Sequence, residues 1–205
     1  HVGLESMSGL VDDGTLEPCA DSLKIIAPAA IGFACTSASF IRGLEGEAAI
    51  RRQIAEFSGS PATTTSGGIL AGCRALGLKR VAVAAPYVEE VSVRLGRFLE
   101  EGGVGVSQVR HMGLEEGIAE VSADEVVRVG VETDTPDAEG LVISCTNLAT
   151  LDAIPILEDR LGKPVVSANQ ATVWHSCVLA GVPWADDFGV GRLWRANRPA
   201  AVAAE

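Results

Sequence analysis

The chain has 205 residues, of which 47% are hydrophobic and 21% are charged, and its formal net charge is −11 at pH 7. That hydrophobic content predicts a globular protein and excludes a disordered chain. The sixteen Lys and Arg residues are scattered, so the chain lacks the clustered positive charge that nucleic-acid binding requires, and we expect no nucleic-acid partner.

The first four residues, HVGL, predict a short strand. This strand runs directly into residues 5–18 without the turn signals that normally follow a first strand. We therefore expect a loop to be missing between Leu4 and Glu5 or nearby.

From residue 30 onward, short runs of β-type residues alternate with helical patterns. The predicted strands are residues 30–35, 61–65, 80–85, 104–109, 140–145 and 164–168. The predicted helices are residues 44–57, 66–76, 87–102, 122–132, 154–162 and 170–181. Strands separated by helices predict a mostly parallel sheet with right-handed crossovers, and hence an α/β fold.

Two segments form a weak internal repeat. IGFACTSAS at 31–39 and LVISCTNLA at 141–149 share an apolar strand followed by Cys, Thr, and then Ser or Asn. Cys35 and Cys145 therefore fall at the carboxyl ends of predicted parallel strands, where open α/β sheets bind their ligands. If the two halves face each other across a pseudo-twofold axis, the two cysteines flank one cleft.

Two facing thiols suit chemistry on a carboxylate. The residues after each cysteine, Thr36 with Ser37 and Thr146 with Asn147, offer hydroxyl, amide and N–H groups that can hold a carboxylate or an enolate. A thiolate and a thiol on opposite faces can move a proton across a carbon atom, or add to a double bond and protonate it. Neither route needs a metal or an organic cofactor. The alternative is that each cysteine is a packed core residue.

Tyr87, the only tyrosine, follows the predicted strand 80–85 and so lies at the same edge as the cysteines. It can donate its phenol proton to a ligand carboxylate, or simply pack where the next helix begins. His111 and His175 lack metal-ligand spacing and are read as structural.

The most apolar stretch, residues 25–35, contains Pro28 and is shorter than the roughly 20 residues that span a bilayer. No signal peptide is visible, so we predict a cytoplasmic protein without a membrane partner. The five cysteines are odd in number, widely spaced and never arranged as CxxC, which argues against a disulfide framework and against a metal site.

Four segments in order carry a family resemblance: FACTSASFIRG, ALGLKRVAVAAPYVEEV, GLVISCTNLATLDAIP and RLGKPVVSANQATVW. Over residues 30–182 the chain resembles the maleate isomerase and arylmalonate decarboxylase branch of the aspartate/glutamate racemase superfamily. The resemblance implies two similar Rossmann-like lobes with parallel sheets, a pseudo-twofold axis, an active site at their interface, no cofactor and a homo-oligomer. We place residues 1–60 and 181–205 in the first lobe and 61–180 in the second.

By the same resemblance, Cys35 and Cys145 match the two catalytic cysteines of the isomerases and racemases. The decarboxylases have glycine at the position of Cys35, so two thiols argue against a simple decarboxylase. Thr36, Ser37 and Thr146 match positions that bind the substrate carboxylate or stabilise an enediolate.

Tyr87 also matches such a position, and Asn147 is a neighbouring candidate. Two features depart from the family: a substrate-binding loop is missing after HVGL, and Glu115 and Glu116 stand where maleate isomerases use an asparagine.

The function that this pattern predicts is cis-trans isomerisation of a small dicarboxylate by two cysteines. One thiolate, assigned to Cys35, adds to the double bond, and Cys145 acts as general acid and base. The alternatives are a racemase or a decarboxylase-like enzyme using the same site, and a binding module that senses a carboxylate without catalysis.

Overall fold

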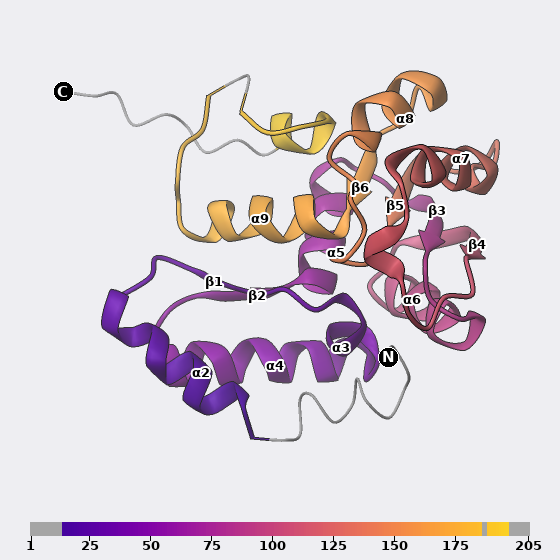
Figure 1. The fold of residues 1–205 in the computed structure, drawn as a ribbon. Helices are drawn as coiled ribbons and strands as arrows, with labels where there is room; N and C mark the ends of the chain where they lie inside the picture. Colours follow the sequence, from indigo (N-terminus) through magenta and orange to yellow (C-terminus); the bar gives the residue numbers. More distant parts are fainter. Residues whose placement is uncertain (1–13, 186–187, 197–205) are drawn as a thin grey trace.

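The computed structural model describes residues 14–185 and 188–196 (Figure 1). The helices are α2 (Leu16–Leu23), α3 (Thr36–Phe40), α4 (Gly43–Ser58), α5 (Thr65–Ala75), α6 (Glu89–Glu101), α7 (Ala123–Thr133), α8 (Ala153–Leu161) and α9 (Ala168–Leu179), with short 3-10 helices η1 (Lys24–Ile26), η2 (Ile118–Glu120) and η3 (Arg192–Arg195). The strands are β1 (Ile31–Phe33), β2 (Ala62–Thr64), β3 (Arg80–Ala85), β4 (Gly105–His111), β5 (Gly140–Ile143) and β6 (Val165–Ser167). The predicted strand at 1–4 and the loop expected to be missing beside it lie outside the described residues.

The strands form two parallel sheets. One sheet pairs β1 with β2, and the other has the order β4-β3-β5-β6. Parallel neighbours need crossover connections, which the intervening helices supply. The predicted α/β fold with two lobes and parallel sheets is confirmed.

The first sheet is covered on both faces, by α4 on one side and α9 on the other (Figure 1). Ile50 and Ile54 of α4 are buried against Ala62 of β2 and Ala20 of α2. Their spacing of four residues places them on one face of the helix, as the sequence pattern predicts.

The second sheet carries the larger core. Its central strands β3 and β5 are buried along nearly their whole length, which explains their continuous apolar sequences. The neighbouring helix α6 buries Val91, Leu95, Phe98 and Leu99 on one face. It begins at Glu89, two residues later than predicted, because Val88 has an extended backbone and forms the N-cap.

Helix α5 leads from the first sheet to the second and packs closely against α9. A Cβ atom on Gly68 would lie 2.8 Å from the carbonyl oxygen of Ala171, so the two helices touch through their backbones. Because β2 pairs with β1, we propose that the lobe boundary falls after β2, in α5, and not at residue 60.

Within residues 14–185 and 188–196, no helix is both long and apolar enough to cross a membrane.

Candidate active site

Cys35 lies two residues beyond β1 and is the N-cap of α3, a short helix that the sequence analysis did not predict. Its backbone is extended, and the helix begins at Thr36. The thiol is partly exposed, and its sulfur lies 4.0 Å from Oγ of Ser37. Thr36 and Ser37 are themselves buried. The thiol and these two side chains therefore share the carboxyl end of the first sheet.

Two buried serines that the sequence analysis missed hold the first turn of α3. Ser39 and Ser66 both donate to the carbonyl of Thr36, at 2.8 and 3.1 Å, and their hydroxyls lie 2.7 Å apart. The pair fixes the peptide that follows Cys35. Ser66 lies in α5, far along the chain from Thr36, so no local sequence pattern predicts this contact.

Cys145 lies two residues beyond β5, and its φ of 87° is in the left-handed region. Non-glycine residues seldom adopt this conformation, and it recurs at functional sites. The thiol is buried, which raises its pKa; the backbone amides of Asn147 and Leu148 act in the opposite direction, although burial prevails. The side chain of Asn147 is exposed, so its contact with the thiol is made by the backbone.

Tyr87 is 1% exposed and lies between the two lobes. Its phenol oxygen accepts a hydrogen bond from Oγ of Ser144 at 3.2 Å, and its ring packs against Phe40 of α3 with a centroid distance of 6.2 Å. Burial raises the pKa of Tyr87 well above its ordinary value, and the neighbouring Cys145 raises it further. The hydroxyl of Thr36 is near enough to lower that pKa.

The two cysteine loops meet. Thr146 donates a hydrogen bond of 3.4 Å to the carbonyl of Ala34, the residue before Cys35. The charge of the Cys35 thiolate raises the pKa of Cys145, as expected for two nearby acids. The structure thus brings the two cysteines together across the interface between the sheets.

The other predicted residues lie around this pair. Tyr87 is buried beside Cys145, and the buried Thr36 lies beside Tyr87. Ser37 lies beside Cys35, and Thr146 and Asn147 follow Cys145 in the second loop. Oγ1 of Thr36 is buried and makes no hydrogen bond of normal geometry with the described residues. A buried hydroxyl of this kind is available to a ligand oxygen.

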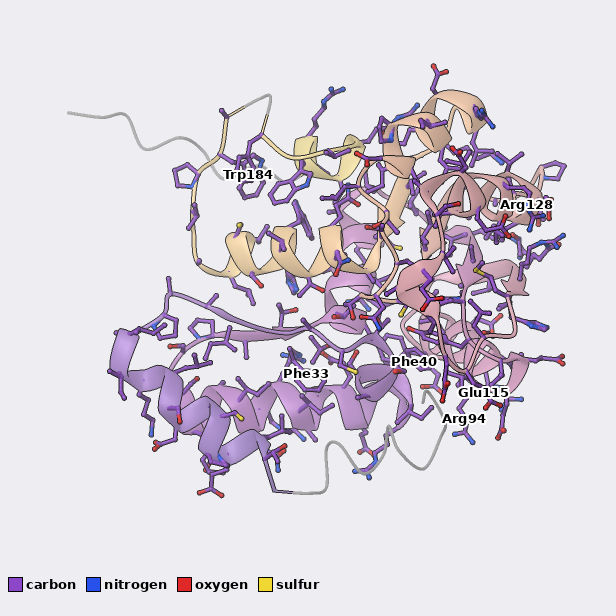
Figure 2. All side chains as sticks on the ribbon, in the orientation of Figure 1. Phe33, Phe40, Arg94, Glu115, Arg128 and Trp184 are labelled. Atoms are coloured by element: carbon purple, nitrogen blue, oxygen red, sulfur yellow. The ribbon has the colours of Figure 1, made fainter. Side chains whose placement is uncertain are left out.

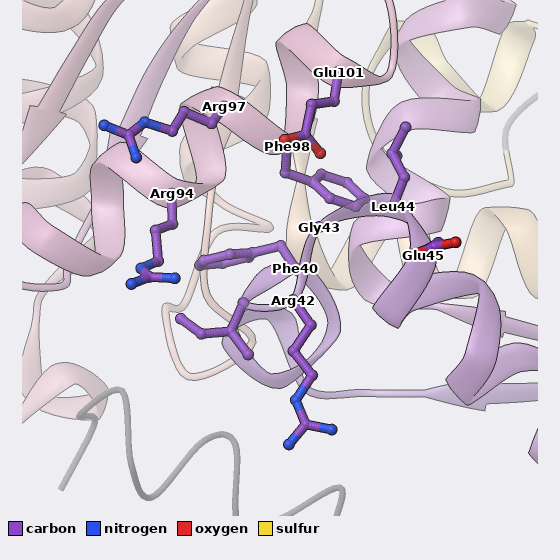
Figure 3. A pocket seen from close by; sticks show the side chains of 10 residues that line it. Phe40, Arg42, Gly43, Leu44, Glu45, Arg94, Arg97, Phe98 and Glu101 are labelled. Atoms are coloured by element: carbon purple, nitrogen blue, oxygen red, sulfur yellow. The ribbon is translucent and has the colours of Figure 1, made fainter.

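A cavity of about 650 Å³ lies apart from the thiols, between the start of α4 and helix α6 (Figure 3). Phe40 lines it, and Figure 2 shows this ring close to Arg94. The same ring packs against Tyr87, so α3 separates the cavity from the cysteines.

His111 is exposed on β4, whereas Nδ1 of His175 lies 2.7 Å from Oγ1 of Thr63. Burial lowers the pKa of His175. Neither belongs to a cluster of three or more His, Cys, Asp or Glu in the described part of the chain that could hold a metal ion.

Comparison with known proteins gives one consistent result. The sequence profile of the arylmalonate decarboxylase family matches residues 3–194. Arylmalonate decarboxylase from Bordetella bronchiseptica is 37% identical over 94% of this chain and 83% of that protein.

Two solved structures are informative. A liganded variant of arylmalonate decarboxylase, with one glycine replaced by cysteine and one cysteine by serine, is 38% identical, with a TM-score of 0.82 over 91% of this chain and 79% of that one. A cysteine-to-serine mutant of the maleate cis-trans isomerase from Nocardia farcinica, with a covalently bound succinylcysteine intermediate, is 25% identical, with a TM-score of 0.83 over 89% of this chain and 78% of that one.

Proposed function

Since the chain belongs to the arylmalonate decarboxylase family, we propose that it is a cofactor-independent isomerase in which Cys35 and Cys145 act together on a small dicarboxylate of the maleate type. One observation carries the proposal: two thiols stand at the carboxyl ends of β1 and β5, in loops joined through Thr146 and Ala34. A decarboxylation by a single thiol has no use for the second.

The proposed reaction begins when the Cys35 thiolate adds to one carbon of the cis double bond. A C–S bond forms, and the electron pair of the double bond moves onto the neighbouring carboxylate as an enediolate. Cys145 protonates the adjacent carbon, which gives a succinyl thioether with a rotatable single bond. After rotation the Cys145 thiolate takes the proton back, the double bond reforms, and the Cys35 thiolate leaves.

The two thiol environments support this division of roles. Burial raises the pKa of Cys145, which keeps that thiol protonated and suits a general acid. Cys35 is partly exposed at the start of α3, where a substrate can reach it. The succinylcysteine in the Nocardia isomerase is the kind of intermediate that this route requires.

The negative charge of the enediolate needs donors. We assign them to the hydroxyls of Thr36 and Ser37 and to the backbone at Asn147, while the hydroxyl of Thr146, which donates to Ala34, holds the second loop in place. The hydroxyl of Thr36, which lacks a partner of normal geometry among the described residues, is the strongest candidate. Donors fixed before the reaction stabilise such a charge without further reorganisation.

A second candidate is decarboxylation of an arylmalonate, in which Cys145 alone protonates the carbanion that remains after CO2 leaves. The 37% identity with arylmalonate decarboxylase favours it. The two thiols also fit a racemase, which removes and returns a proton at one carbon. The decarboxylation requires only Cys145, whereas the isomerase and the racemase require both cysteines and differ in their substrates.

The test is to incubate the protein separately with maleate and with phenylmalonate, following fumarate by NMR and CO2 release. A third incubation of 2-aryl and 2-amino acids in D2O detects label at the α-carbon. We expect fumarate from the parent and none from Cys35→Ser or Cys145→Ser, while Cys177→Ser, which alters a cysteine of α9, remains active. Decarboxylation that survives Cys35→Ser and is lost in Cys145→Ser would establish the second candidate instead. Ligand binding without any turnover would indicate the binding module.

A further inference from the structure

Each cysteine is followed by a threonine whose carbonyl accepts a hydrogen bond from a side chain of another element. Oγ of Ser66 donates to the carbonyl of Thr36 at 3.1 Å, and Nδ2 of Asn169 donates to the carbonyl of Thr146 at 3.0 Å. Ser66 is fully buried and Asn169 is half-buried. The peptide after each cysteine is therefore held by a polar side chain from a distant part of the chain.

The two donors occupy equivalent positions in the two sheets. Phe33 of β1 lies opposite Thr64 of β2, and Ile143 of β5 lies opposite Ser167 of β6. In each sheet the cysteine comes two residues after the first member of this pair, and the donor comes two residues after the second. The same contact therefore forms twice, at the carboxyl end of two parallel strand pairs, which indicates one role in both halves of the site.

Both donors lie in the capped first turn of a helix. The hydroxyl of Thr64 accepts from the backbone N–H of Gly67 at the start of α5, and the hydroxyl of Ser167 accepts from that of Gln170 at the start of α9. In each helix the donor is the second residue. The donors therefore reach the threonine carbonyls from positions that the caps and the sheets hold in place.

Holding a carbonyl also fixes the amide of the same peptide. A trans peptide is planar, so its C=O and N–H groups point in opposite directions. The peptide whose carbonyl Asn169 holds ends in the N–H of Asn147. Burial has the larger effect on the pKa of the Cys145 thiol and raises it, and the N–H of Asn147 lowers it. Asn169 thus fixes the direction of an amide that stabilises the Cys145 thiolate.

The first loop is arranged in the same way. The peptide that Ser66 holds ends in the N–H of Ser37, and the hydroxyl of Ser37 lies 4.0 Å from the sulfur of Cys35. This loop has a second donor, because Ser39 donates to the same carbonyl at 2.8 Å. The Thr146 carbonyl accepts from no other side chain in the described part of the chain. Loss of one donor should therefore matter less in the first loop than in the second.

We propose that Ser66 and Asn169 are equivalent positioning residues, one for each cysteine. Each directs the backbone N–H group that lies two residues after its cysteine toward the sulfur and toward the negative charge that develops beside it in the reaction. The inference rests on the proposed function, because a positioning residue for each sulfur matters only if both cysteines react. Neither side chain touches the substrate.

The experiment measures the pH midpoint of iodoacetamide alkylation at each cysteine separately, by mass spectrometry of the two peptides, so no substrate is needed. Asn169→Leu keeps the approximate size of the side chain but removes the donor. We expect it to raise the Cys145 midpoint by about half a pH unit, the effect of one ordinary hydrogen bond, and to leave the Cys35 midpoint in place. The double variant Ser39→Ala/Ser66→Ala should raise the Cys35 midpoint instead. Ser66→Ala alone should raise it by less.

Ser58→Ala is the matched control. Ser58 is buried, and its Oγ donates to the Ile54 carbonyl at 2.6 Å, at the last residue of α4. Its loss should move neither midpoint. Equal movement of both midpoints in Asn169→Leu, or movement of neither, would overturn the assignment. If Asn169→Leu does not fold, Asn169→Ala tests the second loop, and the serine variants test the first loop independently.

Turnover separates this inference from the proposed function. If the parent converts maleate, Asn169→Leu should lower kcat about fivefold with KM nearly unchanged, because the amide acts on charge that develops during the reaction. A change confined to KM would contradict the positioning role. A parent that produces no fumarate would remove the proposed isomerase, whereas the alkylation midpoints would still decide whether Ser66 and Asn169 each act on one cysteine.

Discussion

The hydroxyl of Thr146 donates to the carbonyl of Ala34 across 3.4 Å, and this contact joins the loop after Cys145 to the residue before Cys35. The backbone of the same threonine is held from the other side, since Nδ2 of Asn169 donates to its carbonyl at 3.0 Å. Thr146 therefore links the first lobe, the second cysteine loop and α9.

We expect Thr146→Val to lower kcat/KM about tenfold while changing the melting temperature little, because it removes the hydroxyl but keeps the shape of the side chain. Thr146→Ser retains the hydroxyl and should stay near the parent. Thr133→Val is the control: its buried hydroxyl donates to the Val129 carbonyl within α7, away from the site. A loss of activity equal in the valine and serine variants would contradict the role of the hydroxyl.

The two thiols also interact electrostatically. Because the charge of Cys35 raises the pKa of Cys145, Cys35→Ser should lower that pKa. The pH midpoint of iodoacetamide alkylation at Cys145, followed by mass spectrometry of the peptide that contains it, should then move downward. Cys177→Ser provides the comparison and should leave the midpoint in place. An unchanged midpoint in Cys35→Ser would mean that the sulfurs are too far apart to act on one substrate.

The contact between α5 and α9 should tolerate no side chain at Gly68. Its Cβ would meet a backbone carbonyl at 2.8 Å, which cannot move without shifting a helix, so Gly68→Ala should reduce the free energy of unfolding by about 1–3 kcal/mol. At Gly72, on the same helix, a Cβ would meet side-chain atoms of Leu193 at 3.3 Å and of Val166 at 3.4 Å, and no backbone atom among these nearest neighbours. Gly72→Ala should cost less, and urea unfolding of the two variants measures the difference.

The sequence alone was sufficient for the strands β1 to β6. Strands β3 and β5 are buried on both faces, and that burial appears in the sequence as continuous apolar runs. Cys35 follows β1 and Cys145 follows β5, which belong to different sheets, so it was the repeated Cys-Thr pattern after two strands that suggested pairing these cysteines.

The supporting residues could not be found in this way. Ser66 contacts the Thr36 carbonyl from 30 positions away, and Ser144 contacts the phenol of Tyr87 from 57 positions away. Nothing in the local sequence distinguishes such serines from those that cap helices or line turns. Helix α3 was not predicted because five residues are too few to show a helical period.

Acid should destabilise the protein through His175. Burial and the nearby Arg51 lower the pKa of this histidine in the folded state below its ordinary value of 6.5, so the unfolded chain binds a proton at a higher pH than the native protein does. The contribution of neutral His175 to the free energy of unfolding is therefore complete above about pH 6.5. It is lost as the pH falls from there through the lowered pKa of the folded state. His175→Gln should flatten this decline in melting temperature between pH 7 and 5, since glutamine cannot titrate and can still bond to Thr63. His111→Gln alters a histidine exposed on β4 and should keep the decline; an equal slope in parent and His175→Gln would exclude His175 as its source.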